Sequence, residues 1–269
     1  GFTLGTDDYT NGNGSTFVAW NWDMGGTTAS NTNGSITSSV RANTTYGQSI
    51  VSYTGTGSST NTDTVGHGLS QKPDLYILKN RTAANSWLVR TDVIDGSSDF
   101  LLLDGTAAKS DSGVNYADSS VFSLGASAGD NGSGNAHIAY CFHDVANYSK
   151  FSSYEGTGGT HTITTGFAPA FVMIKNADAS GNWTMWDNTR NPNNPVTQLL
   201  RANTSGAEET KTDREPSFLS TGFSIGDGDA DTNASGQTYI YAAFADTREY
   251  AYWYDQSGNN NDWTSEGGL

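Results

Sequence analysis

The sequence predicts an all-β protein built from tandem antiparallel β-sandwich repeats, jelly-roll-like and about 100 residues each. Three observations predict this class. The 269 residues include 32 Gly and only 5 Pro, and 12% are aromatic. Short apolar runs are separated by turns rich in Gly, Asn and Ser, and no long stretch has helical periodicity. A third observation, a phrase that occurs three times, indicates internal repetition.

The repeated phrase has a fixed layout. Its copies open with FTLG, FSLG and FSIG, aligned at Phe2, Phe122 and Phe223. A polar loop follows, and then an apolar run, VAWNW, IAYCF or IYAAF. We expect each run to be a strand, including Val18–Trp22, with alternate residues on one face. Trp22 is therefore predicted to pack between sheets.

Further segments repeat upstream of the phrase. SYTGTG at Ser52 matches SYEGTG at Ser153, and PDLYILKN at Pro73 matches PAFVMIKN at Pro169. The chain therefore reads as the end of one unit, two whole units and a tail, and we expect the parent chain to be longer. The predicted divisions are closing strands of a preceding repeat (1–24), a polar linker (25–33), two β-sandwich repeats (34–146 and 147–250) and a tail (251–269).

Within the first repeat, alternating apolar runs between turn residues predict seven short strands. They are Ser49–Tyr53, Asp63–Gly66, Leu75–Lys79, Trp87–Arg90, Phe100–Leu103, Val121–Leu124 and His137–His143.

Charge and cysteine content exclude several function classes. Thirteen Lys and Arg against 28 Asp and Glu give a net charge of −15. Because no cluster of cations can neutralise phosphates, nucleic acid is not an expected partner. No apolar run is long enough to insert in a membrane. Cys141 is the single cysteine, so it forms no disulfide within the chain, and its apolar surroundings predict a buried thiol.

Several phrases in combination resemble a known family. GFTLGTDD, VGHGL with KPDLYILKNRT, FAPAFVMIKNADASGNW and TYIYAAFAD are similar to a repeated domain of tail-fibre and virion appendage proteins in marine and cyanobacterial bacteriophages. The resemblance implies a structural or adhesive virion protein, extracellular, contacting other virion proteins and a host cell-surface glycan or protein, and homotrimeric in a fibre. The tail phrase YDQSGNNND resembles the start of laminin-G-like, concanavalin-type domains.

Aromatic loops are the candidate binding residues. Rigid rings on loops recognise surfaces and sugars well. The alternative is that the rings pack between adjacent units. The candidates are Trp183, Trp186, Asn188, Arg190, Tyr252 and Trp253.

We expect no bound cofactor, and calcium is the single candidate ion. Asp227, Asp229 and Asp231 alternate with small residues, as carboxylates do at the start of a calcium loop. The glycine and glutamate that complete an EF-hand are missing, so an acidic, solvated turn is the alternative.

No catalytic motif is present, and we expect no enzymatic activity. Asp92, Asp95, Asp99 and Asp104 cluster in the first repeat, and paired carboxylates hydrolyse glycosidic bonds. A polysaccharide depolymerase is therefore one alternative function. A ligand-free spacer or capsid-decorating protein is the other.

Overall fold

The computed structural model describes residues 2–212, 216–226 and 228–246, and it confirms the all-β prediction. Two single-turn helices occur there, α1 (Asp8–Asn11) and α2 (Ala128–Asn131). The strands are β1 (Ala29–Asn31), β2 (Ser38–Asn43), β3 (Gln48–Thr54), β4 (Thr64–Gly66), β5 (Leu75–Asn80), β6 (Leu88–Thr91), β7 (Asp99–Leu102), β8 (Ser110–Asp111), β9 (Val121–Ser123), β10 (Ala136–Phe142), β11 (Ser149–Glu155), β12 (His161–Thr164), β13 (Phe171–Asn176), β14 (Thr184–Asp187), β15 (Gln198–Arg201), β16 (Glu209–Thr210), β17 (Pro216–Leu219), β18 (Gly222–Ile225) and β19 (Thr238–Phe244).

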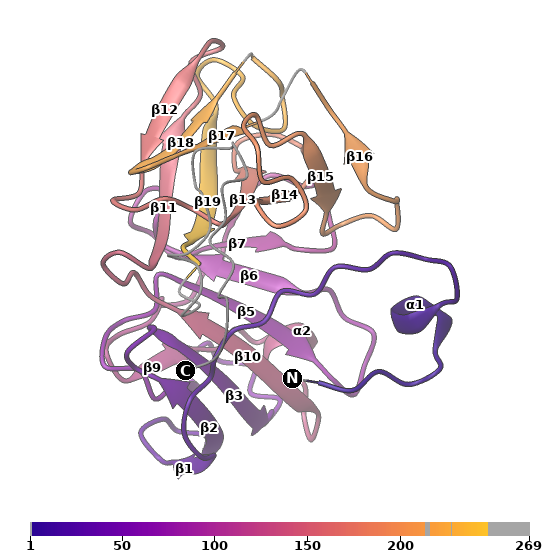
Figure 1. Cartoon of the computed structure of the whole chain (residues 1–269). Coiled ribbons are helices and arrows are strands. Elements are labelled where there is room, and N and C mark those ends of the chain that lie inside the picture. Colours follow the sequence, from indigo (N-terminus) through magenta and orange to yellow (C-terminus); the bar gives the residue numbers. More distant parts are fainter. Residues whose placement is uncertain (1, 213–215, 227, 247–269) are drawn as a thin grey trace.

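The strands form two large and two small sheets (Figure 1). The first large sheet has the order β1-β2-β3-β10-β5-β6-β7-β8, and the second has the order β11-β19-β13-β14-β15-β16. The small sheets are β4-β9 and β12-β18-β17. The central strand of each large sheet runs antiparallel to both neighbours.

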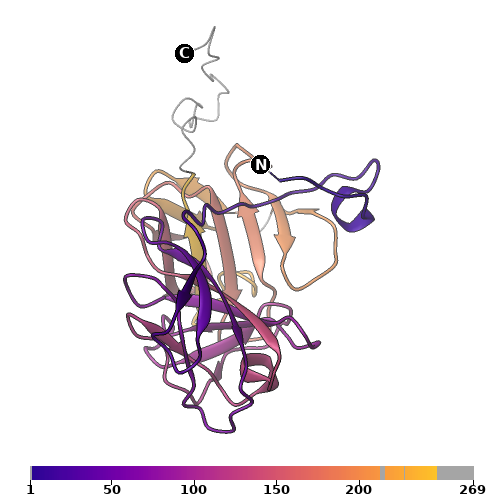
Figure 2. The same ribbon diagram turned by 90° about the horizontal axis from the view of Figure 1, so that it is seen from below.

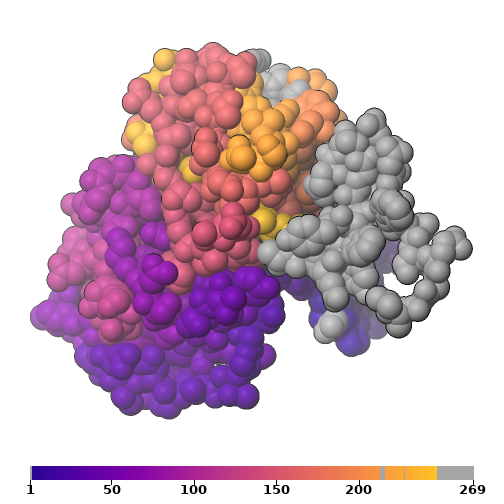
Figure 3. Space-filling model, turned by 60° about the vertical axis from the view of Figure 1, so that its left-hand side comes forward, coloured from indigo at the N-terminus to yellow at the C-terminus, as the bar shows by residue number. Residues whose placement is uncertain are grey.

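Three hydrophobic cores separate these sheets into four layers. The first core lies between the first large sheet and β4-β9, and the second core lies between the second large sheet and β12-β18-β17. A shared core joins the two large sheets and includes Val89 and Phe142 from one and Phe171 and Phe244 from the other. Figure 3 shows the two halves as lobes in direct contact.

Side-chain alternation along the strands produces this layering. On β10, Ala139 and Cys141 face the first core, whereas Tyr140 and Phe142 face the shared core. Because successive strand residues point to opposite faces, a strand with apolar residues at every position is buried on both sides. The two large sheets therefore form the middle of the molecule.

The two large sheets have equivalent connections. β3-β10-β5-β6-β7-β8 and β11-β19-β13-β14-β15-β16 take their strands from the chain in the same order. The hydroxyl of Tyr53 donates to the carbonyl of Asp130 at 2.6 Å, and Tyr154 donates to the carbonyl of Thr232 at 2.5 Å. The shared strand order and the equivalent tyrosine hydrogen bonds are what two copies of one unit are expected to have. We refer to the described residues of 34–146 and 147–250 as the first and second units.

All seven strands predicted for the first unit are present, as β3–β7, β9 and β10, and no end is shifted by more than one residue. Strands β1, β2 and β8 were not predicted. Strand β1 falls inside the predicted linker 25–33 and pairs with β2 through Ala29 and Val40. This part of the linker is therefore an edge strand of the first large sheet.

The predicted strand Val18–Trp22 is wrong, because these residues join no ladder in the described structure. They form an extended strap that crosses the edge of the shared core. The packing prediction for Trp22 is confirmed, since its ring centroid lies 6.4 Å from that of Phe142 and 5.4 Å from that of Phe244. A strand needs a neighbour that hydrogen-bonds to its backbone, and no strand of the described residues pairs with the strap.

Candidate functional site: a groove at the junction of the units

Two predicted binding residues are buried, so their exposure was predicted wrongly. Trp183 is 1% exposed and belongs to the shared core, and Trp186 is 0% exposed and belongs to the second core. The indole nitrogen of Trp183 donates to the carbonyl of Leu102 at 2.8 Å, across the unit boundary. Trp183 thus packs between the units, as the alternative predicted, whereas Trp186 packs inside the second unit.

The other predicted loop residues lie at the surface near the strap. Arg190 donates to Asp187 at 2.7 Å and to Glu208 at 2.6 Å, and its guanidinium lies 5.8 Å from the ring centroid of Trp20. Asn188 is half-buried beside it. Tyr252 and Trp253, and the tail phrase that contains them, lie outside the described residues.

The described carboxylates of the acidic loop accept hydrogen bonds from neighbouring amides. Asp227 lies outside the described residues. Asp229 accepts the backbone N–H of Asp231 at 2.9 Å, and Asp231 accepts the backbone and side-chain amides of Asn182 at 2.8 and 3.0 Å. Among the described residues, no three His, Cys, Asp or Glu side chains are grouped closely enough to hold a metal ion. The described carboxylates hold the loop against the second large sheet.

Three of the four carboxylates of the depolymerase alternative are engaged in ion pairs, and the fourth, Asp104, accepts the backbone N–H of Trp87 at 3.2 Å. Lys109 pairs with both Asp95 and Asp99, and Lys72 pairs with Asp92. Hydrogen bonds from Lys109 and Ser97 lower the pKa of Asp95, whereas burial raises the pKa of Asp99. The charged form is therefore stabilised at Asp95, whereas burial favours the protonated form at Asp99.

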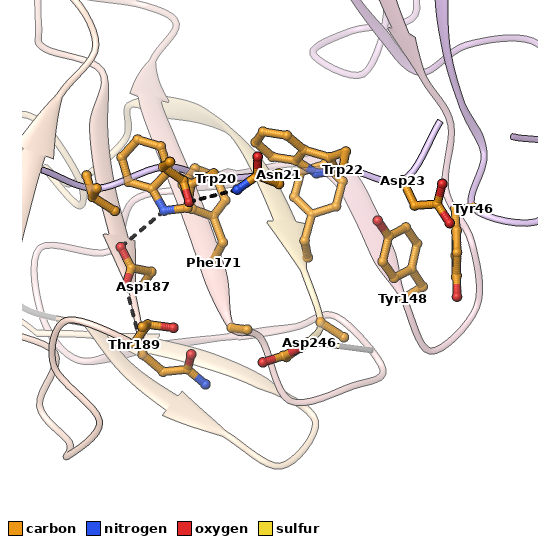
Figure 4. A pocket seen from close by; sticks show the side chains of 16 residues that line it. Trp20, Asn21, Trp22, Asp23, Tyr46, Tyr148, Phe171, Asp187, Thr189 and Asp246 are labelled. Atoms are coloured by element: carbon orange, nitrogen blue, oxygen red, sulfur yellow. Dashed lines mark hydrogen bonds between the residues drawn. The ribbon is translucent and has the colours of Figure 1, made fainter. Parts of the chain in front are cut away.

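A groove of about 510 Å³ lies where the strap meets the two units (Figure 4). We call it the junction groove. Its lining residues are Val18, Ala19, Trp20, Asn21, Trp22, Asp23, Tyr46, Tyr148, Ala170, Phe171, Asp187, Asn188, Thr189, Phe244, Ala245 and Asp246.

The rings of the groove are fixed by their neighbours. The indole nitrogen of Trp20 donates to Asp187 at 3.1 Å, and its ring packs edge-on against Phe171 with 5.4 Å between centroids. Tyr46 and Tyr148 form a tilted pair with centroids 4.7 Å apart. Figure 4 shows this pair at one end of the groove and Asp187 with Thr189 at the other.

The electrostatics of the groove disfavour anionic ligands. Its lining contains Asp23, Asp187 and Asp246 but no Lys or Arg. Burial, with a smaller effect from Tyr46, raises the pKa of Tyr148 to about 12, so this hydroxyl stays a hydrogen-bond donor at neutral pH. Carboxylates accept hydrogen bonds from hydroxyl groups, and amides both accept and donate them. The three carboxylates would repel an anionic ligand.

Sequence reasoning found Asn188 and the Trp20–Trp22 face but not the groove itself. Its walls come from residues 18–23, 46, 148, 170–171, 187–189 and 244–246. No local pattern joins segments so far apart. The repeat offers one signal, because the strap and the ends of β10 and β19 are equivalent segments and would meet in a packed array.

No helix among the described residues is both long and apolar enough to cross a membrane.

Comparisons with curated proteins and with solved structures each gave no match. A family profile matches residues 1–248, which is most of the chain. The chain therefore belongs to the family described as a domain of unknown function, DUF7483.

Proposed function

We propose that the chain is a structural and adhesive module of a bacteriophage virion appendage, which attaches to a host-surface glycan through the junction groove. The observation that carries the adhesive part is the groove itself. It combines aromatic rings, short polar side chains and acidic acceptors in one concavity of about 510 Å³. Binding pockets for small ligands have volumes of roughly 300–1,000 Å³. The virion setting rests on the sequence resemblance of the repeated phrases.

The lining chemistry suits a neutral sugar. A pyranose has one apolar face, which stacks on an aromatic ring, and hydroxyl groups at its edge, which bond to amides and carboxylates. Tyr46, half-buried, and its neighbour Tyr148 supply the rings. Asn188 and the exposed Thr189 supply donors and acceptors at the opposite end. Because no cation lines the groove, binding should depend little on salt.

The structural part of the proposal is supported by the shared core. Val89 and Leu101 of the first unit pack with Trp183 and Ile240 of the second unit in one cluster of buried side chains. Apolar interfaces of this kind hold neighbouring units in a fixed orientation. A shallow site repeated along such an array binds more tightly through avidity than one site does alone. A homotrimeric fibre would multiply the sites further.

The test is retention on immobilised host-surface polysaccharides, with released reducing ends measured in the same samples. We expect retention without release. Tyr46→Ala should weaken retention at least about fivefold, since a ring that stacks on a ligand contributes about 1–3 kcal/mol. The matched control is Tyr9→Ala, because Tyr9 is 93% exposed and lies outside the groove. Melting temperatures of both variants show whether the fold is intact.

Each remaining outcome contradicts part of the proposal. Release of reducing ends indicates a depolymerase and directs attention back to Asp95 and Asp99. Absence of retention on every polysaccharide, with a folded protein, indicates a spacer. Light scattering that gives a monomer for the natural full-length protein contradicts the trimer.

A further inference from the structure

A cavity of about 150 Å³ lies in the shared core, next to the junction groove. We call it the apolar cavity, because the described residues expose no polar atom in it. Its walls come from both large sheets and from the strap, and they include Ile77 on β5, Met173 on β13 and Trp22. Figures 1 and 2 both show the strap running past the sheets as a single extended segment. Protein cores contain few voids larger than a water molecule, so a space of this size needs a cause.

One cause is a small residue after β15. In the first unit, the N–H of Leu103 donates to the carbonyl of Trp87 at 2.9 Å. In the second unit, the N–H of Ala202 donates in the same way to the carbonyl of Trp183 at 3.1 Å. Ala202 therefore occupies the position of Leu103 with a smaller side chain, and both residues line the cavity.

The other cause is a small residue on β19. Ala242 lies opposite Met173 in the second large sheet, as Tyr140 lies opposite Ile77 in the first. The ring of Tyr140 stacks on that of Trp87, with 6.4 Å between centroids. Ala242 has no ring to fill the equivalent volume. Two alanines of the second unit thus leave open a space that the larger residues of the first unit occupy.

The wall of the cavity is deformable on the side of the second unit. Met173 on β13 and Met185 on β14 are direct cross-strand partners, and both line the cavity. Both side chains are half-buried, and the cavity is not closed off from solvent. Methionine is unbranched and polarisable, so it adapts to the shape of an apolar ligand and contacts aromatic rings favourably.

The chemistry of the lining selects the ligand. A water molecule, an ion or a sugar hydroxyl would find no hydrogen-bond partner among the described atoms that the cavity exposes. The indole nitrogen of Trp20 already donates to Asp187 at 3.1 Å. Apolar cavities of roughly 150 Å³ stay dry and bind benzene or xenon.

We propose that the apolar cavity is a second binding site, which takes an uncharged hydrocarbon group about the size of a benzene ring. Four rings line both this cavity and the junction groove, namely Trp20, Trp22, Phe171 and Phe244. The group therefore has two sources, a free small molecule or the apolar substituent of a sugar held in the groove. The second source rests on the proposed function, whereas the cavity itself does not.

NMR of the methionine methyl groups tests the proposal directly, because the chain has three methionines. Met173 and Met185 line the cavity, whereas Met24 lies outside both the cavity and the groove. Titration with benzene should shift the signals of Met173 and Met185 in a saturable way and leave that of Met24 unchanged. Benzene should also raise the melting temperature, since it binds the folded chain.

Ala202→Leu gives the second unit the residue of the first unit and fills the cavity. Benzene affinity should fall at least about tenfold, while the melting temperature without benzene shows that the variant is folded. The matched control is Ala207→Leu, because Ala207 is exposed and lies outside the cavity. This control should keep the benzene affinity of the unsubstituted chain.

Phenyl and methyl glycosides of one sugar distinguish the two sources. A phenyl glycoside that shifts Met173 and Met185, with no shift from the methyl glycoside, identifies a sugar substituent. Shifts with benzene alone identify a free small molecule.

Three results would overturn the proposal: no methionine shift with benzene or the phenyl glycoside, equal shifts of all three methionines, or unchanged benzene affinity in Ala202→Leu. Benzene contains no sugar, so a failure of glycan retention leaves the benzene titration unaffected. The two proposals therefore fail separately.

Discussion

At equivalent positions in the two units, the first core buries an ion pair and the second core buries an indole. Arg90 on β6 pairs across the ladder with Tyr76, and Trp186 on β14 pairs across its ladder with Val172. Arg90 therefore lies opposite the large Tyr76, whereas Trp186 lies opposite the smaller Val172. The side-chain volume is redistributed between neighbours, which keeps the core filled.

The residue that contacts position 90 is also charged in the first unit, and its equivalent in the second unit is uncharged. Asp130 pairs with Arg90 and accepts the N–H of Gly125 at 2.7 Å, whereas its equivalent Thr232 is buried and uncharged. Within the described residues, Arg90 Nε and Nη1 and Asp130 Oδ1 have no hydrogen-bond partner. A buried pair with unsatisfied atoms does not recover its full desolvation cost. The comparison teaches that the topology does not depend on this pair, because the second unit has the same strand order without it.

The largest effect is expected when one partner of the ion pair is removed. Asp130→Ala leaves the Arg90 cation buried and uncompensated, which costs about 3–5 kcal/mol of the free energy of unfolding. Urea unfolding at neutral pH measures this loss. The double variant Arg90→Met with Asp130→Asn should recover most of it, since it keeps an acceptor for Gly125. A double variant as unstable as the single one would show that the first core needs the charges.

Trp186→Ala tests the second core at the equivalent position. Removing a fully buried indole leaves a cavity, and we expect a loss of about 3–5 kcal/mol. In contrast to Asp130→Ala, no second substitution that removes polarity should restore stability. A loss under about 1 kcal/mol would mean that the second core collapses around the space, and it would contradict the packing described above.

Lys175 gives a pH-dependent difference between the units. It is 0% exposed on β13, and burial lowers the pKa of its amine to about 8, while its equivalent Lys79 on β5 is half-buried. Between about pH 8 and pH 10.5 the unfolded chain binds more protons than the folded chain. The free energy of unfolding should therefore rise with pH in this window, by on the order of 2 kcal/mol.

Urea unfolding from about pH 7 to pH 9.5, below the titration of ordinary tyrosine at about pH 10, checks this rise in a Cys141→Ala background, because the unfolded thiol titrates at about pH 8.5 and would oppose it. Tyr53 and Tyr154 have raised pKa values because of burial, so they oppose the trend only at higher pH. Lys175→Met should remove the slope, and the control Lys79→Met should retain it. If the free energy of unfolding of Lys175→Met still rises with pH, another group causes the rise.

Cys141 gives the smallest expected effect. It lies on β10 at the position that Ala243 occupies on β19, and burial raises the pKa of its thiol to about 12. Cys141→Ala converts this position to the residue of the second unit and should cost about 1 kcal/mol. The intact protein should resist maleimide labelling until it unfolds. Rapid labelling of the folded protein would contradict the burial of Cys141.

Local chemistry explains how well the strands were predicted. The short apolar runs in Leu75–Asn80 and in Ala136–Phe142 are visible in the residues themselves, and Gly and Asn in the adjoining turns mark the ends. Strand β1 was missed because Ala29–Asn31 is polar and short. Only pairing with β2 makes it a strand. The same dependence on a neighbour explains why Val18–Trp22, with a strong strand pattern, forms none.

The candidate site was less predictable than the strands. Trp183 and Trp186 lie in a stretch rich in Asn, which predicts a surface loop, yet β14 carries Trp186 into the second core. Exposure depends on what lies above each face of a strand, and sequence alone does not supply that layer. The junction groove joins residues more than 200 positions apart, which only folding brings together.

The sequence by itself determined the all-β class, the order of the strands and which residues share a strand face, because these follow from the period of two and from turn chemistry. The tertiary structure decided which face meets another sheet. It also decided that Trp22, Phe142 and Phe244 meet in one core and that Phe2 stays exposed. Burial of apolar area stabilises a contact only when a second surface is present to cover it, and that surface belongs to the assembled fold.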